Sequence, residues 1–269
     1  LSNDSFEKLR RLILTQTQLD QVVDIGPDVF PGAKNETMVF LLGNKSPALN
    51  AKNTVVITTT AKTFPTPTNR FHISQMDWLK NPRSTWLINV SSNELDLISQ
   101  MERASFRLGR LCSINQGMRT GDNEKYLGQT RLSKKWKPAA GGKEVGRYQP
   151  LPPGLFVYYE PAVLDAPRRP EIFESREKLV VQEIRNITLF RRIIATYDDN
   201  QFYCLQSTNV INLLEPEGAH RLKFLLGVLN SEAANFFFRL KFPGNNHIPS
   251  NQLSEIPIPK AEPDAQSIV

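Results

Sequence analysis

Residues 222–238 read LKFLLGVLNSEAANFFF, and residues 256–259 read IPIP. The first eight residues are mostly apolar and predict a helix, which ends at Asn230. Ser231 is then placed to cap a second helix, because a serine hydroxyl accepts a hydrogen bond from the first helical turn. The phenylalanines that follow are expected to fill a core, and the prolines of the last segment end the fold. We therefore expect a structural role for this stretch.

A second stretch, Leu108 to Asn123 (LGRLCSINQGMRTGDN), starts as an apolar-periodic run and becomes a loop with Gly117 and Gly121. Glycine accepts positive φ and lets another backbone approach closely, so this loop can hold the Arg119 guanidinium in a fixed place. Arginine, threonine and asparagine hydrogen-bond base edges. Arg119, Thr120 and Asn123 are thus candidate DNA contacts. An ordinary glycine-rich turn after a strand has the same pattern, so that alternative stays open.

Positive charge is concentrated in the middle of the chain. Residues 61–150 contain 15 Lys or Arg against 7 Asp or Glu, whereas the whole 269-residue chain has a net charge of +6. Residues 1–60 are neutral, and residues 151–269 are slightly acidic. A localised basic surface suits a polyanion, because phosphate contacts release counterions. A solvated basic face without a partner is the alternative.

Several classes of protein and site are disfavoured. No apolar run approaches the length of a membrane span, and no secretory signal is present, so we expect a cytoplasmic protein without a membrane partner. Cys112 and Cys204 are expected as buried free thiols. The three histidines (His72, His220 and His247) have no metal-ligand spacing. Phosphate-binding and dinucleotide-binding glycine loops are also missing.

The remaining pattern predicts a mixture of helices and strands. Helices are expected at 6–17, with Asp4 or Ser5 as cap, at 93–103 and at 170–176; strands are expected at 19–25, 35–42, 54–60, 154–159, 179–186, 190–197 and 202–205. Residues 198–201 are expected as a hairpin turn, and the proline-containing residues 61–90 as an irregular bridge. The first 60 residues hold too few elements to close an α/β core. We expect them to leave apolar surface that a neighbour or residues 61–90 cover.

Three segments carry a resemblance to a known family. Val22 to Pro31 (VVDIGPDVFP), followed by a strand, resembles the end of the catalytic domain of TaqI-type N6-adenine DNA methyltransferases. Leu108 to Tyr126 resembles the beginning of the target recognition domain of these enzymes, and similar loops open the recognition domains of type I restriction specificity subunits. Leu-Asn-Ser at 229–231, with Ile-Pro-Ile-Pro about 25 residues later, resembles a TaqI-like recognition domain.

The resemblance implies roles for particular residues. Phe30, beside Pro31, stands where the family stacks a phenylalanine on the adenine flipped out of the duplex. Arg119 stands where the family has a base-contacting arginine, and Gly142 to Tyr148 (GKEVGRY) resembles another family segment. Independently of the resemblance, Lys134, Lys135 and Lys137 are expected around Trp136 in an unconstrained loop. They either contact phosphates or form only a mobile surface loop, and both alternatives stay open. The candidate DNA contacts are Arg119, Thr120, Asn123, Lys134, Lys135, Lys137, Lys143, Arg147, Tyr148, Arg185 and Asn186.

The family's methyl-transfer motifs are missing from this sequence. Leu151-Pro152-Pro153-Gly154 lacks the amide and the aromatic residue of the catalytic motif, and Asn81-Pro82-Arg83 lacks its second proline. The glycine-containing cofactor loop has no counterpart either. We therefore expect no cofactor in this chain, with S-adenosylmethionine held by the parent enzyme.

The resulting expectation is an α/β and α+β chain: the remnant of a methyltransferase sheet and a mixed α/β TaqI-like target recognition domain. Residues 1–90 form the last catalytic-domain strands and a bridge, 91–104 a linking helix, 105–260 the recognition domain and 261–269 a tail. The partners are double-stranded DNA and the remainder of the methyltransferase, with or without a fused nuclease. Two alternatives stay open: a type I specificity subunit, and a small metal-dependent nuclease using Asp122, Glu124 and Glu144.

Overall fold

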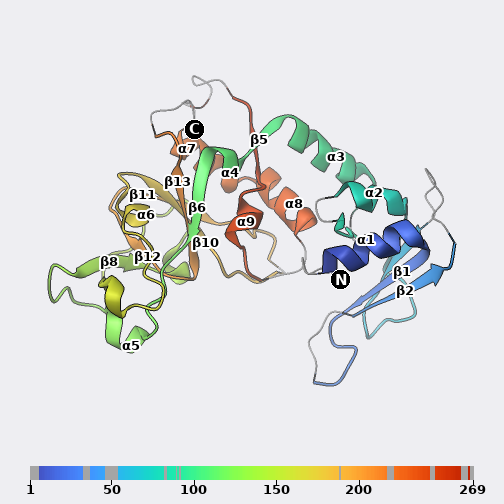
Figure 1. The fold of residues 1–269 in the computed structure, drawn as a ribbon, viewed down its shortest axis with the longest axis horizontal. Coiled ribbons are helices and arrows are strands. Elements are labelled where there is room, and N and C mark those ends of the chain that lie inside the picture. The colour runs from blue at the N-terminus through green and yellow to red at the C-terminus, as the bar shows by residue number, and fades with distance from the viewer. Residues whose placement is uncertain are drawn as a thin grey trace. The chain divides into compact units, whose positions relative to one another are not determined.

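A computed structural model describes residues 6–32, 37–45, 54–81, 84–88, 90, 92–187, 189–216, 221–242, 246–261 and 266. The expected mixed α/β fold is confirmed. The chain divides into two compact units, Leu1–Leu97 and Ile98–Val269 (Figure 1). The division falls inside helix α3 (Ser92–Arg103). Asp4 and Ser5, the proposed caps of the first helix, lie outside the described residues.

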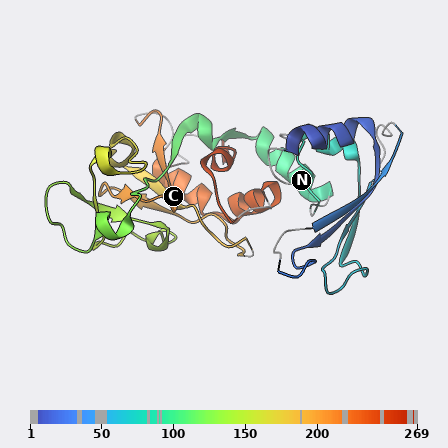
Figure 2. The same cartoon turned by 60° about the horizontal axis from the view of Figure 1, so that its bottom comes forward.

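The first unit is a four-stranded sheet with helices on one face. Its elements are α1 (Glu7–Gln16), β1 (Gln18–Gly26), β2 (Thr37–Gly43), β3 (Thr54–Thr58), β4 (Asn69–Ile73) and α2 (Gln75–Lys80). The strand order is β2-β1-β3-β4, in which β1 and β3 are parallel and the other pairs antiparallel. Figures 1 and 2 show α1 lying against one face of this sheet.

Residues 61–90 are not the irregular bridge that the prolines suggested. They supply β4, which pairs with β3, and α2, whose Trp78 is 1% exposed. The Trp78 and Trp86 rings stack with centroids 5.3 Å apart and pack with Leu14 and Val22 in one core. Burial of Trp78 and Trp86 stabilises regular structure in a segment for which the prolines alone predict a loop. Residues 61–90 thus cover one face of the sheet, as anticipated.

The other face of this sheet is partly exposed at its β2 edge. Val39 and Leu41 are 47% and 55% exposed, and they alternate along the strand with the half-buried Met38 and Phe40. Period-two alternation places Val39 and Leu41 on one face of the sheet. The expected apolar surface of the first 60 residues is therefore present along β2.

The second unit contains most of the chain's short elements. They are β5 (Ser105–Arg107), α4 (Leu108–Leu111), β6 (Cys112–Gln116), α5 (Asn123–Tyr126), β7 (Leu127–Gly128), β8 (Trp136–Ala140), the 3-10 helix η3 (Gly142–Glu144), β9 (Phe156–Tyr158), the 3-10 helix η4 (Pro161–Val163), α6 (Glu171–Glu174), β10 (Lys178–Gln182), β11 (Ala195–Asp198), β12 (Tyr203–Cys204), β13 (Thr208–Leu213), α7 (Leu222–Leu229), α8 (Glu232–Lys241), α9 (Ser250–Leu253) and β14 (Pro257–Pro259).

These strands form an antiparallel sheet β11-β10-β13-β6, a second sheet β12-β8-β9-β7 and the pair β14-β5. Figure 1 shows β6, β13 and β10 side by side, with β8 and β12 beyond them. Residues from both four-stranded sheets, including Ala139, Val157, Val180 and Val210, share one buried core. The two sheets therefore belong to one folding unit.

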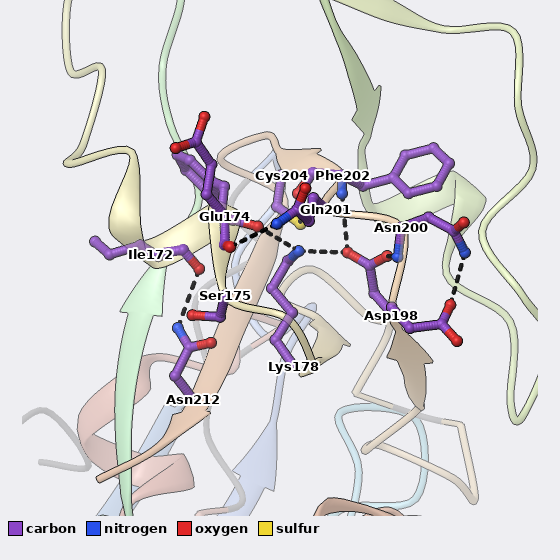
Figure 3. Close-up of polar contacts among 12 residues, drawn as sticks. Ile172, Glu174, Ser175, Lys178, Asp198, Asn200, Gln201, Phe202, Cys204 and Asn212 are labelled. Carbon is purple, nitrogen blue, oxygen red and sulfur yellow. Dashed lines mark hydrogen bonds and ion pairs between the residues drawn. The ribbon is translucent and has the colours of Figure 1, made fainter. Parts of the chain in front are cut away.

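The predicted hairpin at residues 198–201 is wrong, because β11 pairs with β10 and β12 pairs with β8. The buried Asp198 carboxylate accepts hydrogen bonds from the backbone N–H of Asn200 (2.8 Å) and Phe202 (3.0 Å). It also pairs with the buried Lys178 ammonium at 2.5 Å (Figure 3). Lys178 donates a further hydrogen bond to the Phe173 carbonyl at 2.6 Å. These interactions direct the chain out of one sheet and into the other. Composition at 198–201 predicts a turn but carries no information about this crossing.

The Leu-Asn-Ser stretch has the structural role expected of it. Ser231 caps α8 by accepting a hydrogen bond from Ala234 N, which confirms the prediction. The Asn230 side chain accepts from Ala195 N and donates to Ala195 O, both at 2.9 Å. Asn235 accepts from Ile193 N at 2.7 Å and donates to Ser231 O at 3.0 Å. Two buried amides thus hold residues 193–195 against α7 and α8 as a neighbouring strand would.

Both cysteines are buried free thiols, as predicted. Burial raises the pKa of Cys112 and the pKa of Cys204 to about 12. The thiolate is the nucleophilic form of cysteine, so these side chains act as core residues at neutral pH.

Replacing Asn230 by alanine should destabilise the second unit by about 2 kcal/mol, because it leaves the buried N–H of Ala195 without a partner. It also removes one of the two donors to the Ala195 carbonyl, which keeps the 3.2 Å hydrogen bond from Tyr148 N. Urea unfolding measures the free energy of unfolding. Asn251→Ala is the matched control, since Asn251 is exposed on α9. An Asn230→Ala protein as stable as the Asn251→Ala protein would contradict the role given to this amide.

Candidate nucleic-acid interface

Several loops meet at one end of the β11-β10-β13-β6 sheet. β6 and β10 finish there and β13 begins there, because neighbouring strands are antiparallel. The Gln116 amide donates to Glu183 Oε1 at 2.8 Å and to the Gln206 carbonyl at 3.2 Å. The Gly142 N–H donates to Ser207 Oγ at 2.8 Å. We call this surface the polar end and define it as residues 116–119, 142–143, 165–168, 182–186 and 206–207.

Gly117 is required where β6 enters the polar end. A Cβ atom at this position would lie 2.1 Å from the Leu205 carbonyl oxygen and 2.5 Å from its carbon. Gly117 N donates to Thr208 O at 2.9 Å, and Met118 N donates to Cys204 O at 2.8 Å. The loop therefore runs in direct backbone contact with the segment between β12 and β13. The expected role of this glycine, a close backbone approach, is confirmed.

Arg119 is positioned by its backbone and by a carboxylate. It exchanges two backbone hydrogen bonds with Ala166, at 2.9 and 3.0 Å. Its Nε atom lies 3.1 Å from Asp165 Oδ2, and its side chain is 53% exposed. With Nε occupied by Asp165, the outer edge of the guanidinium carries the Nη atoms. This is the edge that a guanidinium presents to two acceptors at once.

Thr120 and Asn123 support this loop from within. Thr120 is 4% exposed, and its hydroxyl donates to Asn123 Oδ1 at 2.6 Å. Asp122 caps the short helix α5 by accepting from Lys125 N at 3.1 Å. The structure thus turns Thr120 inward, away from the surface that exposes Arg119.

Arg168 is a polar-end residue that the sequence did not indicate. Its backbone has φ +58°, and its carbonyl accepts a 2.7 Å hydrogen bond from the Tyr159 hydroxyl. Its guanidinium donates to Gly117 O at 3.5 Å and to Gln116 Oε1 at 3.3 Å. No motif surrounds Arg168, and its partners lie more than 50 residues earlier in the chain. Only the fold brings Arg168 beside Arg119.

Three further predicted residues lie at the polar end. Lys143 is exposed on η3, and Asn186 is exposed beyond β10. The half-buried Arg185 donates to Arg191 O at 2.6 Å and to Gln182 Oε1 at 2.9 Å, and burial lowers its pKa. The structure therefore gathers Arg119, Lys143, Arg185 and Asn186 from segments far apart in sequence.

The lysines near Trp136 are more constrained than we expected. Lys135 pairs with Glu160, and this hydrogen bond raises the Lys135 pKa. Lys137 lies on β8, 3.4 Å from Glu174 Oε1. The Tyr203 hydroxyl also donates to Glu174 and is the main cause of the lowered Glu174 pKa. The expectation of an unconstrained loop is thus wrong for Lys135 and Lys137, whereas Lys134 is exposed in the loop before β8.

Arg147 and Tyr148 lie beside the helices α7 and α8. The Arg147 guanidinium donates to the Asn230 carbonyl at 3.3 Å, at the end of α7, and lies 4.7 Å from the centre of the Tyr148 ring. Tyr148 lines a mainly apolar cavity of about 610 Å³. The other cavity residues are Met101, Ala104, Ser105, Phe224, Gly227, Val228, Ser231, Ala233, Ala234, Pro257 and Pro259.

Phe30 and Pro31 are exposed in the first unit, in the turn after β1. The Phe30 side chain is 60% exposed. Gly26, Asp28 and Gly32 have φ of +73°, +64° and +77°. These left-handed residues shape a turn in which the Phe30 ring is exposed and is not part of a hydrophobic core.

The structure does not assemble a metal site from the acidic residues considered for a nuclease. Glu144 accepts from Gly141 N at 2.8 Å, and Asp122 caps α5. Within the described part of the chain, no group of three histidine, cysteine or acidic side chains gathers as metal ligands would. None of the described helices combines the length and apolar character needed to cross a bilayer.

Residues 137–258, a little less than half of the chain, match the model of the TaqI-like C-terminal specificity domain. This segment lies wholly within the second unit, and the Arg119 loop precedes it. No curated protein matches the chain in sequence.

Solved structures that resemble the chain at low identity include the following three. The HsdS subunit from Thermoanaerobacter tengcongensis is 14% identical, with 65% of this chain and 42% of that chain covered and a TM-score of 0.40. The type IIL restriction-modification enzyme MmeI in complex with DNA is 10% identical, with 91% and 34% covered and a TM-score of 0.47. The type IIG restriction endonuclease BpuSI is 11% identical, with 96% and 38% covered and a TM-score of 0.42. The chain spans less than half of each of these proteins.

Gly117→Ala should destabilise the second unit by at least about 2 kcal/mol, because the new methyl group overlaps the Leu205 carbonyl and the backbone must shift. The free energy of unfolding is the quantity to measure. Gly43→Ala is the control, since a Cβ there meets its nearest atom at an ordinary 3.4 Å. The close approach at Gly117 would be refuted by two variants of equal stability.

Proposed function

We propose that the TaqI-like specificity domain at residues 137–258, together with the Arg119 loop, recognises a specific sequence in double-stranded DNA within a restriction-modification system. The observation that carries this proposal is the held and exposed Arg119 guanidinium at the polar end. Lys143, Arg185 and Asn186 surround the same strand ends. A basic surface with one fixed, planar donor suits a reader of duplex DNA.

The chemistry of the side chains determines which of these residues recognise bases and which contact phosphates. An arginine recognises guanine by donating to O6 and N7 in the major groove. Arg119 is suited to this contact because Asp165 fixes the guanidinium through Nε and leaves its Nη edge outward. A lysine ammonium at a phosphate carries no sequence information. Lys143 and the exposed Lys134 therefore contribute affinity for any duplex.

The parent protein in this proposal is an N6-adenine DNA methyltransferase. The exposed Phe30, next to Pro31, supports it, because a base flipped out of the duplex needs an aromatic plane to replace its lost stacking. In this arrangement the first unit completes the catalytic domain, and its apolar β2 surface docks on the remainder of that domain. Whether a nuclease is fused to the parent does not alter the role of this chain.

S-adenosylmethionine does not suit the cavity beside α7 and α8. The residues lining the 610 Å³ cavity are apolar or small, apart from the hydroxyls of Ser105, Tyr148 and Ser231, and include no carboxylate for the ribose hydroxyls. An adenosyl group bound there would lose hydrogen bonds that water supplies. The methyl donor in this proposal is held by the remainder of the parent enzyme.

Arg119→Ala should relax the sequence choice of the chain at one position while it still binds duplex DNA. The lost guanidinium contact is worth about 1–3 kcal/mol of discrimination, or roughly a 5-fold to 150-fold change in preference. Binding to randomised duplexes, followed by sequencing of the bound fraction, measures this preference. Arg131→Ala is the matched control, because Arg131 is exposed in the loop before β8 and outside the polar end.

The Arg131→Ala protein should select the same sequence as the wild type, with a salt slope lower by about one unit if Arg131 contacts one phosphate. An Arg119→Ala protein that selects the unchanged sequence would contradict the assignment of Arg119. A wild-type chain without any sequence preference would contradict the proposed function as a whole.

Phe30→Ala in the intact methyltransferase should lower the methylation rate about 10-fold, because stacking of a base on an aromatic side chain is worth about 1–3 kcal/mol. Affinity for the duplex should change little. The single-turnover rate measures methylation itself. The fluorescence of 2-aminopurine at the target position measures how far that base is unstacked from the duplex.

Phe64→Ala is the control for this experiment, since Phe64 is a similarly exposed phenylalanine of the same unit, at 54% against 60% for Phe30. Equal rates for the two variants would rule out stacking by Phe30. That result would favour a specificity subunit, in which no residue of this chain holds a flipped base.

A further inference from the structure

Arg168 has a backbone conformation that arginine rarely adopts. Its φ of +58° lies in the left-handed region, where a side chain crowds the following carbonyl. The Tyr159 hydroxyl holds this conformation by donating to the Arg168 carbonyl at 2.7 Å. A glycine or asparagine would fit such a turn with less strain. The presence of arginine here therefore calls for a role of its side chain.

The Arg168 side chain is fixed by a continuous chain of hydrogen bonds. Its Nη2 donates to Gln116 Oε1, and the Gln116 amide nitrogen donates in turn to Glu183 Oε1 and to the Gln206 carbonyl. Glu183 is only 7% exposed. The glutamine is thereby locked with its oxygen toward Arg168. Nη1 of Arg168 has no hydrogen-bond partner among the described residues, and the residue is exposed. Nη1 is therefore available to a ligand.

Arg168 and Arg119 present their guanidinium groups to the same surface. Arg119 and Ala166 are directly opposite each other, exchanging both backbone hydrogen bonds. Arg168 lies two residues beyond Ala166, and its side chain reaches Gly117, two residues before Arg119. The two arginines therefore leave neighbouring backbone segments of the polar end, and both are exposed.

Building on the proposed function, we propose that Arg168 is a second base-reading residue, which recognises a guanine close to the base read by Arg119, and that Gln116 positions it. Each guanidinium is held by Nε from behind: Arg119 by Asp165 and Arg168 by the Gly117 carbonyl. Each keeps outward donors that match the O6 and N7 acceptors of guanine.

A phosphate-binding arginine would not need this environment. Arg169, the next residue, is also exposed, and its side chain has no hydrogen bond or ion pair among the described residues. Phosphate contacts tolerate such mobile side chains because they carry no sequence information. The difference between the two adjacent arginines indicates that the Arg168 guanidinium is held in one direction, which base recognition requires and phosphate contact does not.

The test is selection of bound sequences from randomised duplexes by the 269-residue chain and its variants. Arg168→Lys retains the charge but loses the planar fork, and Arg168→Gly removes the side chain at a backbone that glycine adopts readily. Arg169→Lys is the matched control. Both Arg168 variants should lose at least 5-fold of their preference for guanine at one position, which differs from the position lost in Arg119→Ala.

The outcomes separate the inference from the proposed function. If the wild type selects a motif and both Arg168 variants select it unchanged, Arg168 does not read a base, while the proposed function stands. An effect of Arg169→Lys equal to that of Arg168→Lys would also overturn the inference. If the wild type selects no motif, the proposed function fails, and the inference fails with it.

Gln116 is tested as a positioning residue through its coupling to Arg168. Gln116→Leu should weaken preference at the same position as Arg168→Gly, and the double variant should show no further loss, because both changes remove one contact. Additive losses at different positions would show that Gln116 does not act through Arg168. Thermal unfolding of each variant, without DNA, checks that the effect is confined to recognition.

Discussion

The polar end depends on one close approach, that of Gly117 to the Leu205 carbonyl. No side chain fits between these backbones, so the chain leaving β6 is held directly against the segment that joins β12 to β13. This contact fixes the direction of the next two residues and hence the position of Arg119. The same glycine supplies the carbonyl to which Arg168 donates. One backbone constraint therefore orients both exposed guanidinium groups.

The rest of the second unit stabilises this arrangement from behind. Asn230 and Asn235 bind the backbone of residues 193–195 to the α7–α8 helices, which keeps β11 in place at the edge of its sheet. The buried Lys178–Asp198 pair directs the chain from β11 into β12, the strand on which the Gly117 loop packs. A buried ion pair stabilises little by itself, but removing one partner leaves an uncompensated charge. Its effect here is to specify the crossing between two sheets.

Local pattern predicted most helices and several strands, because their apolar periodicity and caps are encoded within a few residues, as at Ser231. The pattern failed where distant contacts decide the structure. Trp78 and Trp86 belong to a buried core that stabilises β4 and α2, which the proline pattern of this segment does not predict. Similarly, Gly117 identified the Arg119 loop in advance, whereas Arg168 depends on partners about 50 residues away. Counting charges along the sequence likewise could not predict that Glu160 and Glu174 pair with Lys135 and Lys137.

The central claim is that DNA binds at the polar end of the β11-β10-β13-β6 sheet. Gln206 and Leu214 are exposed and flank β13 at its two ends, about 20 Å apart at the usual strand rise. A benzophenone attached to Gln206→Cys or to Leu214→Cys tests the claim, since the two native thiols are buried and unreactive. The account predicts photo-cross-linking to duplex DNA from position 206 and not from position 214. Cross-linking from position 214 alone would contradict it.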